Sequence, residues 1–390
     1  MATTTTTTTA TIKAQLDLIL VIFLAAVTSF TLFFLLVNSG KAMFNIDSYT
    51  YLSNAISIAK GSSEHSASPF INMLSLAIKV LENSHIELLL PLRVLNIVFA
   101  VQLVIFVYLI ARKMFGHFSS TLAALLALFL PLFQSYSITL HNDIFAVSMG
   151  FTSLYFIMKP KLANIVLATA FLIVSVLTRY DMLPIFVIPF VFGIITYIRN
   201  KTGWNLNPIS SGLIVILLIE IAYLAAQGYY HSITRFNPLE RFIVFVRPDI
   251  MWMALKSSIA ITGNQLLDNI YFGFIVSSIC LFIFAQRAKL LAIVRSRDYK
   301  LKEVDTAAVY LTFAFLASFI SLVAFHINYT IVDNKIIFNP VVTPRYFIPV
   351  QLFMVYGFAF ALSSHSLRNL QSTKEYLITK KMTGNKLRNM

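Results

Sequence analysis

The sequence has few charged residues and a single cysteine. Asp, Glu, Lys and Arg make up 12% of the 390 residues, whereas 58% are hydrophobic and the mean hydropathy is +0.79. A soluble chain does not need so many apolar residues, so the composition indicates a membrane protein instead. Cys280, alone in an apolar run, cannot form an intrachain disulfide. Acids are scarce too: 16 against 30 basic residues give a net charge of +14.

Long apolar runs predict an all-α polytopic membrane protein with about ten transmembrane helices. The first run, Leu16 to Val37, has 22 residues, which is too long for a signal-peptide core, so we expect a retained helix. The threonine-rich residues 1–15 predict a disordered cytoplasmic tail, and 364–390 a basic cytoplasmic tail. The expected spans are 16–37, 92–111, 119–138, 144–158, 162–178, 183–198, 209–228, 265–285, 306–326 and 346–363.

The distribution of basic residues predicts the orientation. Alternating the spans places 19 Lys and Arg residues on the side of the N-terminus and 11 on the other, while most acids lie on that other side. This positive-inside pattern predicts that both termini are cytoplasmic, and contact with anionic lipid explains the basic surplus. We therefore expect no nucleic-acid partner. The expected location is the plasma membrane, with the endoplasmic reticulum as the alternative.

The first extracytoplasmic loop, between the first two spans, carries two helical patterns. Apolar residues recur at helical spacing within Ser48–Lys60 and again within Pro69–Leu81. Polar residues alternate with them, which predicts two amphipathic helices lying on the outer membrane surface.

Residues able to do chemistry gather where the spans meet the outer surface. If the helices form a bundle, four such clusters converge at one end, where mixed charges could hold an anionic headgroup beside an acid–base residue. The clusters are Asp47; His141, Asn142 and Asp143; Arg179, Tyr180 and Asp181; and Arg345 with Tyr346.

The order of these motifs resembles the GT-C superfamily of membrane glycosyltransferases, and within it the protein O-mannosyltransferase and aminoarabinose transferase type. The motifs that carry the resemblance, over about residues 10–365, are Ile46-Asp47-Ser48-Tyr49-Thr50-Tyr51-Leu52, Ser68-Pro69-Phe70, Pro91-Leu92-Arg93-Val94-Leu95, His141-Asn142-Asp143, Thr178-Arg179-Tyr180 with Pro184, and Pro344-Arg345-Tyr346-Phe347-Ile348-Pro349.

This resemblance implies that 16–363 forms a transmembrane glycosyltransferase-like domain. It implies a polyprenyl-phosphate-linked sugar as donor, transfer on the extracytoplasmic face and a protein, lipid or glycan acceptor, with membrane lipids as surroundings. Asp47 would be the counterpart of the family's catalytic Asp. Asn45 stands where a DxD motif would have its first Asp. A single carboxylate provides few ligands for a divalent metal, so we assign no metal ligand and no certain cofactor.

Under that interpretation each residue has an expected role. Asp47 is the base that takes the acceptor proton, and Asp143 is the second choice or its orienting partner. Arg345 binds the donor phosphate, because guanidinium groups recognise phosphate in a bidentate way. The auxiliary substrate-binding candidates are Arg93, Arg179, Tyr49, Tyr180 and Tyr346.

Other interpretations stay open at this point. Asp47 and Asp143 could simply cap helices, and the arginines could be interfacial residues without chemistry. Glu220 lies in mid-span and needs a partner within the bundle, which also fits a secondary transporter or lipid flippase. We see no inverted repeat that would support transport. A polymerase or ligase that joins lipid-linked oligosaccharides is a third possibility.

Overall fold

A computed structural model gives the architecture of a large part of the chain. The residues it describes are 2–39, 46–62, 68–82, 89–159, 161–179, 182–202, 273, 310–312, 314, 328–332, 335–339 and 348–361. The seventh expected span, all of the eighth except residue 273, most of the ninth, the tail 364–390, Glu220 and Cys280 lie outside these ranges.

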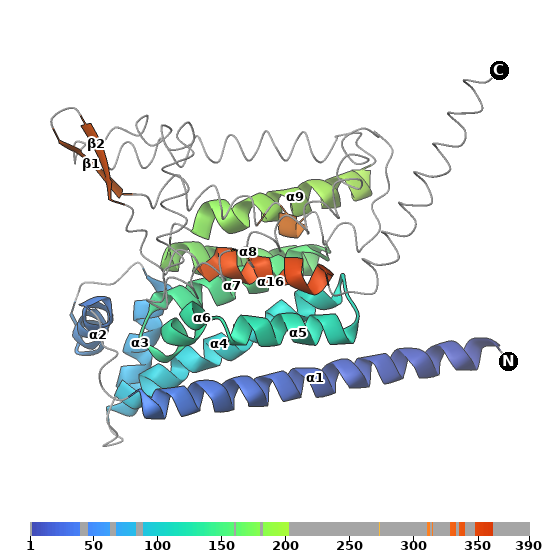
Figure 1. The fold of residues 1–390 in the computed structure, drawn as a ribbon, viewed down its shortest axis with the longest axis horizontal. Coiled ribbons are helices and arrows are strands. Elements are labelled where there is room, and N and C mark those ends of the chain that lie inside the picture. The colour runs from blue at the N-terminus through green and yellow to red at the C-terminus, as the bar shows by residue number, and fades with distance from the viewer. Residues whose placement is uncertain are drawn as a thin grey trace.

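Most helices of the described part run side by side as a bundle, whereas α2 is seen end-on at one end of it (Figure 1). Two of them are central: α4 packs against α1, α5 and α7, and α7 also packs against α8 and α9. The bounds are α1 Ala2–Asn38, α2 Ile46–Ala59, α3 Pro69–Leu81, α4 Leu89–Arg112, α5 His117–Leu128, α6 Pro131–Ile138, α7 Asn142–Ile157, α8 Leu162–Thr178, α9 Met182–Thr202 and α16 Ile348–Ala361.

Two strands accompany these helices. β1 (Asn328–Val332) and β2 (Lys335–Asn339) form an antiparallel hairpin in which Asn328 pairs with Asn339 and Val332 with Lys335. The expectation of an all-α fold therefore holds for the described bundle but missed this hairpin. Short strands of this kind lack the long apolar run on which the prediction of spans depends.

Within the described ranges, two helices are long and apolar enough to cross a membrane: Ala14–Asn38 and Leu89–Arg112. The bent pair α5–α6 would make a third. Helices also occupy the fourth, fifth, sixth and tenth expected spans, although α7, α8 and α16 are short. The total of ten spans and the cytoplasmic position of both termini stay predictions.

The third expected span, 119–138, was predicted as one helix and is in fact broken. α5 ends at Leu128, and α6 starts at Pro131 with a bend of 61° between them. Pro131 has no backbone N–H to donate, and its ring forces Leu130 into an extended conformation (φ −65°, ψ 123°). Because the apolar run continues through the break, hydropathy alone did not reveal it.

The N-terminal segment also differs from the prediction. Residues 1–15 were expected to be disordered, but α1 begins at Ala2 and continues through the threonine tract to Asn38. Extending a helix that is already nucleated costs far less than starting one, so a long apolar span can carry even poor helix formers at its end.

Close approach between α7 and its neighbours depends on small residues. Ser153 Oγ donates to the carbonyl of Ala168 at 2.8 Å, and Ser175 Oγ donates to that of Ala146 at 2.7 Å, which ties α7 to α8. On the side of α9, a Cβ at Gly150 would lie 2.2 Å from Phe186 Cε2. Small residues at such contacts are typical of membrane helices, which gain stability from packing and interhelical hydrogen bonds.

The two helices of the first loop pack on the bundle through a hydrophobic cluster of their own. Its buried members come from α2, α3, α4, the α6–α7 turn and α7, and they are Ala55, Phe70, Ile71, Leu74, Ile78, Leu92, Leu140, Phe145 and Met149. The apolar side of α2 is thus turned toward the other helices. The placement of α2 and α3 at a membrane surface stays a prediction.

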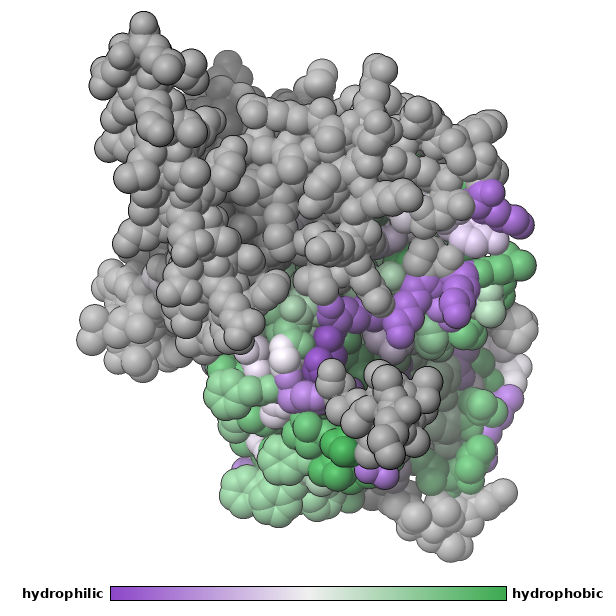
Figure 2. All heavy atoms as spheres, turned by 90° about the vertical axis from the view of Figure 1, so that its right-hand side faces the viewer, coloured by the Kyte–Doolittle hydropathy of each residue, from purple (hydrophilic) through white to green (hydrophobic). Residues whose placement is uncertain are grey.

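The end of the bundle that holds the N-terminus carries a polar network. Asp17 Oδ1 lies 2.7 Å from Arg112 Nε and 3.1 Å from His117 Nδ1, and it accepts a hydrogen bond from the Tyr108 hydroxyl at 2.6 Å. Figure 2, which views this end, shows a band of hydrophilic side chains among the apolar side chains of the described residues. This network links α1, α4 and α5 far from the residues expected to do chemistry.

Candidate functional site

The centre of the candidate site is the start of α7, at the opposite end of the bundle. Asp143, in the first turn of α7, forms an ion pair with Arg179, the residue that ends α8. His141 Nδ1 lies 3.2 Å from the other carboxylate oxygen of Asp143. The side chains of Asp143 and Arg179 are only 2% and 8% exposed. The structure therefore brings together two of the clusters that the sequence predicted would converge.

Burial decides how this ion pair behaves. Both charges have left water, so each depends on the other, and the positive end of α7 adds to the stabilisation of the carboxylate. Asp143 is not a simple helix cap, because its side chain is engaged by Arg179 and His141. Its charge is neutralised and sheltered, which makes it a poor base for an incoming hydroxyl group.

Asn142 connects this centre to the first loop. Its side-chain oxygen accepts a hydrogen bond from the Tyr51 hydroxyl of α2 at 3.1 Å, and its amide nitrogen donates to the carbonyl of Thr178 at 3.3 Å. The ring of Tyr51 also meets the ring of His141 edge-on, with centroids 6.2 Å apart. A single asparagine thus joins α2, α7 and α8.

Asp47 lies in the first turn of α2, one helical turn before Tyr51, and is partly exposed. Four residues of helix correspond to about 6 Å along the axis, so Asp47 and Tyr51 share a face. Because α2 begins at Ile46, Asp47 is inside the helix and not at its N-cap. Asp47 is thus a partly exposed carboxylate on the face of α2 that also holds Tyr51.

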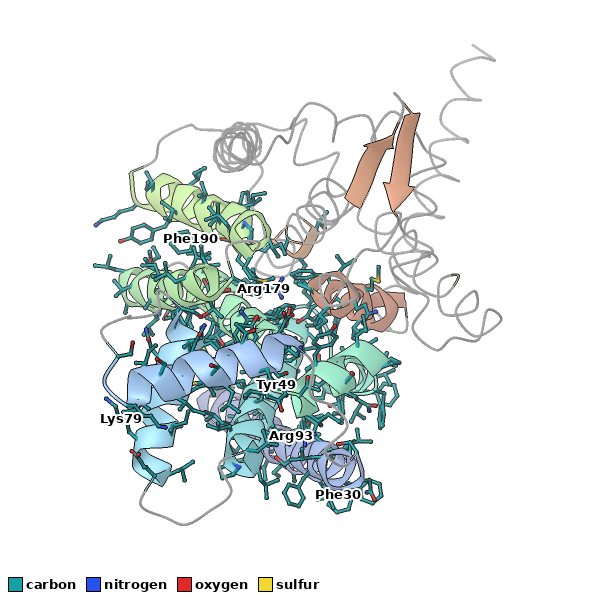
Figure 3. All side chains as sticks on the ribbon, turned by 90° about the vertical axis from the view of Figure 1, so that its left-hand side faces the viewer. Phe30, Tyr49, Lys79, Arg93, Arg179 and Phe190 are labelled. Atoms are coloured by element: carbon teal, nitrogen blue, oxygen red, sulfur yellow. The ribbon has the colours of Figure 1, made fainter. Side chains whose placement is uncertain are left out.

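Tyr49 is placed differently. Its side chain is 67% exposed, and its position two residues after Asp47 puts it on the opposite side of α2. Figure 3, which looks onto this end of the bundle, shows α2 lying across the other helices, with Tyr49 and Arg179 labelled. Tyr49 is thus not brought to the face that Asp47 and Tyr51 share.

Arg93 is buried and already engaged by the protein. Its Nε donates to the carbonyl of Ile138 at 2.7 Å, and one terminal nitrogen donates to Ser39 Oγ at 3.2 Å. It therefore joins the start of α4 to the C-terminal ends of α1 and α6. A role for Arg93 as a phosphate ligand stays a prediction, and the structure gives this residue a second, structural task.

Arg345, Tyr346, Tyr180 and Asp181 lie outside the described residues. The helix that follows Arg345, α16, is described, and two contacts give its direction. Phe353 stacks on Phe151 of α7 with ring centroids 5.0 Å apart. Tyr356, further along α16, donates a hydrogen bond to the carbonyl of Val107, which lies nearer the opposite end of the bundle. α16 consequently starts at the end of the bundle that holds Asp143. That Asp47 and Arg345 share one pocket stays a prediction.

Three residues of this site were missed as participants by sequence reasoning. Tyr51 was noted in an apolar helical face and in the first motif of the family resemblance but was given no role, and Tyr136, whose ring centroid lies 5.0 Å from that of His141, was read as part of a span. Asn96 lies within α4, where a fully buried amide needs partners, and this could have singled it out. Among the described residues, no group of three or more His, Cys, Asp or Glu side chains could hold a metal ion.

Comparison with known proteins supports the resemblance stated above. Residues 71–229 match the family model of the dolichyl-phosphate-mannose-protein mannosyltransferases, a GT-C type family. The matched range contains Arg93, Asn96, the His141–Asp143 turn and Arg179, whereas Asp47 and Arg345 fall outside it. No curated protein and no solved structure matches the chain.

Proposed function

We propose that this protein is an integral membrane glycosyltransferase that moves a sugar, mannose in the first instance, from a polyprenyl-phosphate-linked donor to a hydroxyl group. The observation that carries the proposal is the mannosyltransferase match over residues 71–229. It is supported by the buried group of Asp143, Arg179 and His141 within that range, at the end of the bundle where α2 lies. The proposed acceptor is a protein, as in the name of the matched family. The proposed side of transfer is the extracytoplasmic face.

In the proposed reaction the acceptor oxygen attacks C1 of the sugar. Its proton passes to the carboxylate of Asp47, the new oxygen–C1 bond forms, and the bond from C1 to the phosphate oxygen breaks with inversion. The polyprenyl phosphate leaves with the electron pair of that bond. Arg345 stabilises the phosphate charge, with Tyr346 and Tyr180 as hydrogen-bond donors.

The structure favours a division of labour between the two acids. Asp47 is partly exposed, as a base that meets an acceptor must be. Asp143 is buried and paired with Arg179, so it serves to hold the turn to which α2 is attached through Tyr51. Arg179 is thereby a positioning residue first, and Tyr49 is the weakest of the substrate-binding candidates.

The test is transfer of radiolabelled mannose from polyprenyl-phosphate-mannose to protein in membranes containing each variant. Asp47→Asn removes the base, and we expect the rate to fall roughly a hundredfold or more. Arg345→Ala removes the phosphate partner, with a similar expected loss. Glu82→Gln is the matched control, since Glu82 is an exposed carboxylate at the end of α3, and it should leave the rate unchanged. Full transfer by Asp47→Asn and Arg345→Ala would refute these roles.

A further inference from the structure

The end of α6 presents an unusual demand for hydrogen-bond donors. α6 has only eight residues and stops at Ile138, so the carbonyl groups of its last turn have no N–H four residues further along. Ser137 and Ile138 are buried. A carbonyl left unpaired away from water costs several kcal/mol by rough measure, so these groups must find donors elsewhere.

Two side chains of α4 supply those donors. The amide nitrogen of Asn96 lies 2.9 Å from the carbonyl oxygen of Tyr136, 3.3 Å from that of Ser137 and 2.7 Å from that of Thr139, and its two hydrogens are shared among these three acceptors. The Tyr136 carbonyl also accepts a longer hydrogen bond, of 3.4 Å, from Thr139 Oγ1. Arg93 Nε completes the set by donating to Ile138. All four consecutive carbonyls from 136 to 139 thus face a donor from α4.

The capped segment leads directly into the candidate site. The backbone N–H of His141 donates to the carbonyl of Thr139 at 3.0 Å, and Leu140 is buried in the cluster beneath α2 and α3. The position of the Thr139–His141 turn relative to α4 is therefore set by the hydrogen bonds of Asn96. The Thr139–His141 turn also fixes the start of α7. There Asn142 accepts a hydrogen bond from the Tyr51 hydroxyl, and Asp143 forms its ion pair with Arg179.

We infer that Asn96 is a positioning residue for the proposed transfer reaction, with Arg93 as its partner, because its amide caps α6 and so holds the His141–Asp143 turn in place. This inference rests on the proposed function. Asn96 itself touches neither Asp47 nor the Asp143–Arg179 pair in any hydrogen bond of the described residues, and its effect is transmitted through the backbone of residues 139–141.

The chain offers a matched control on the same helix. Gln102 is also an amide of α4 that donates to a neighbouring helix, with its nitrogen 2.9 Å from Thr152 Oγ1 of α7. It lies almost two turns from Asn96 and has no bond to the turn before α7. Gln102→Met removes a polar contact between helices while leaving the cap of α6 intact.

The experiment compares Asn96→Leu, Asn96→Ser and Gln102→Met in purified full-length protein. Hydrogen–deuterium exchange of the peptide covering 139–143 measures the turn without reference to activity, and we expect it to be roughly tenfold faster in Asn96→Leu. Asn96→Ser keeps one short donor, so its effect should be intermediate, and it guards against a variant that does not fold. Gln102→Met should exchange like the wild type.

Transfer kinetics provide the second readout. Because displacement of about 1 Å at a reacting centre can cost up to a hundredfold in rate, we expect kcat of Asn96→Leu to fall roughly ten- to a hundredfold. KM for the polyprenyl-phosphate sugar should change by less than about twofold, since ground-state binding of the donor is kept. Gln102→Met should retain its kcat.

Two outcomes would overturn the inference: exchange at 139–143 that is equal in Asn96→Leu and Gln102→Met, or a kcat that is unchanged when Asn96 is replaced. A wild-type protein that transfers no sugar, yet shows the expected rise in exchange for Asn96→Leu, would instead refute the proposed function and leave the cap of α6 established.

Discussion

Breaking the buried ion pair between Asp143 and Arg179 should be among the most damaging changes in the described part of the chain. With side chains only 2% and 8% exposed, neither charge can be rehydrated without opening the bundle. Removing one partner of such a pair typically costs about 3–5 kcal/mol, because the other is left buried and uncompensated. We therefore expect Arg179→Gln to lower the free energy of unfolding by about that amount. Asp143→Asn should act similarly, since it removes the carboxylate that faces the buried guanidinium group of Arg179.

The double variant separates the charge effect from the loss of packing. Asp143→Asn with Arg179→Gln leaves two neutral amides that can still meet, so its loss should be smaller than the sum of the single losses by about 2 kcal/mol or more. The pair of Asp17 and Arg112 at the other end of the bundle serves as an internal comparison. Their side chains are 33% and 21% exposed, and the coupling measured with Asp17→Asn and Arg112→Gln should be about 1 kcal/mol or less.

The measurement is unfolding of the purified protein in detergent micelles as the fraction of dodecyl sulfate is raised, followed by far-ultraviolet circular dichroism. The two double-mutant cycles give one coupling free energy for each pair. Equal coupling at the two ends of the bundle would contradict the reasoning, because burial would then not control the strength of the interaction.

The remaining predictions concern packing and the attachment of α2. Gly150→Ala places a methyl group against Phe186 and should lower the free energy of unfolding by about 1–3 kcal/mol. Adding Phe186→Leu should restore part of this loss. Gly116→Ala is the control, because the added Cβ there has open space. Tyr51→Phe removes the hydroxyl that binds α7 and should weaken the attachment of α2 by about 1 kcal/mol, seen as faster proteolysis in α2. Ser53→Ala, at an exposed position of the same helix, should leave that rate unchanged.

Much of the secondary structure was predictable because hydropathy and periodicity act locally. The first two spans were located to within a few residues, and helices do occupy the two segments of the first loop at Ile46–Ala59 and Pro69–Leu81. The break at Pro131 could have been read from the proline itself, but the uninterrupted apolar run outweighed it. Whether a proline breaks an apolar helix depends on the packing of the whole fold, and a short stretch of sequence does not contain that information.

For the candidate site, the sequence predicted only which residues lie at the same end of the bundle, and not which of their side chains contact one another. Alternation of the spans placed His141–Asp143 and Arg179 at one end of the bundle, and the ion pair between them agrees with that expectation. Which arginine pairs with which acid was not readable, and Arg93, expected to bind phosphate, is engaged in capping α6. Such assignments depend on distances between residues that lie tens of positions apart in the sequence.

The sequence alone thus determined the environment of this protein, because its apolar runs demand a membrane, and its basic turns predict a side for each end. Transfer free energies and charge are properties of the residues themselves. Only the tertiary structure decided what the polar residues do there. Packing of α4 against α6, and of α7 against α8, brought Asn96 to orphaned carbonyls and Arg179 to a buried carboxylate. A polar group buried among helices takes the partner that the fold places beside it, and that choice is made by packing in three dimensions.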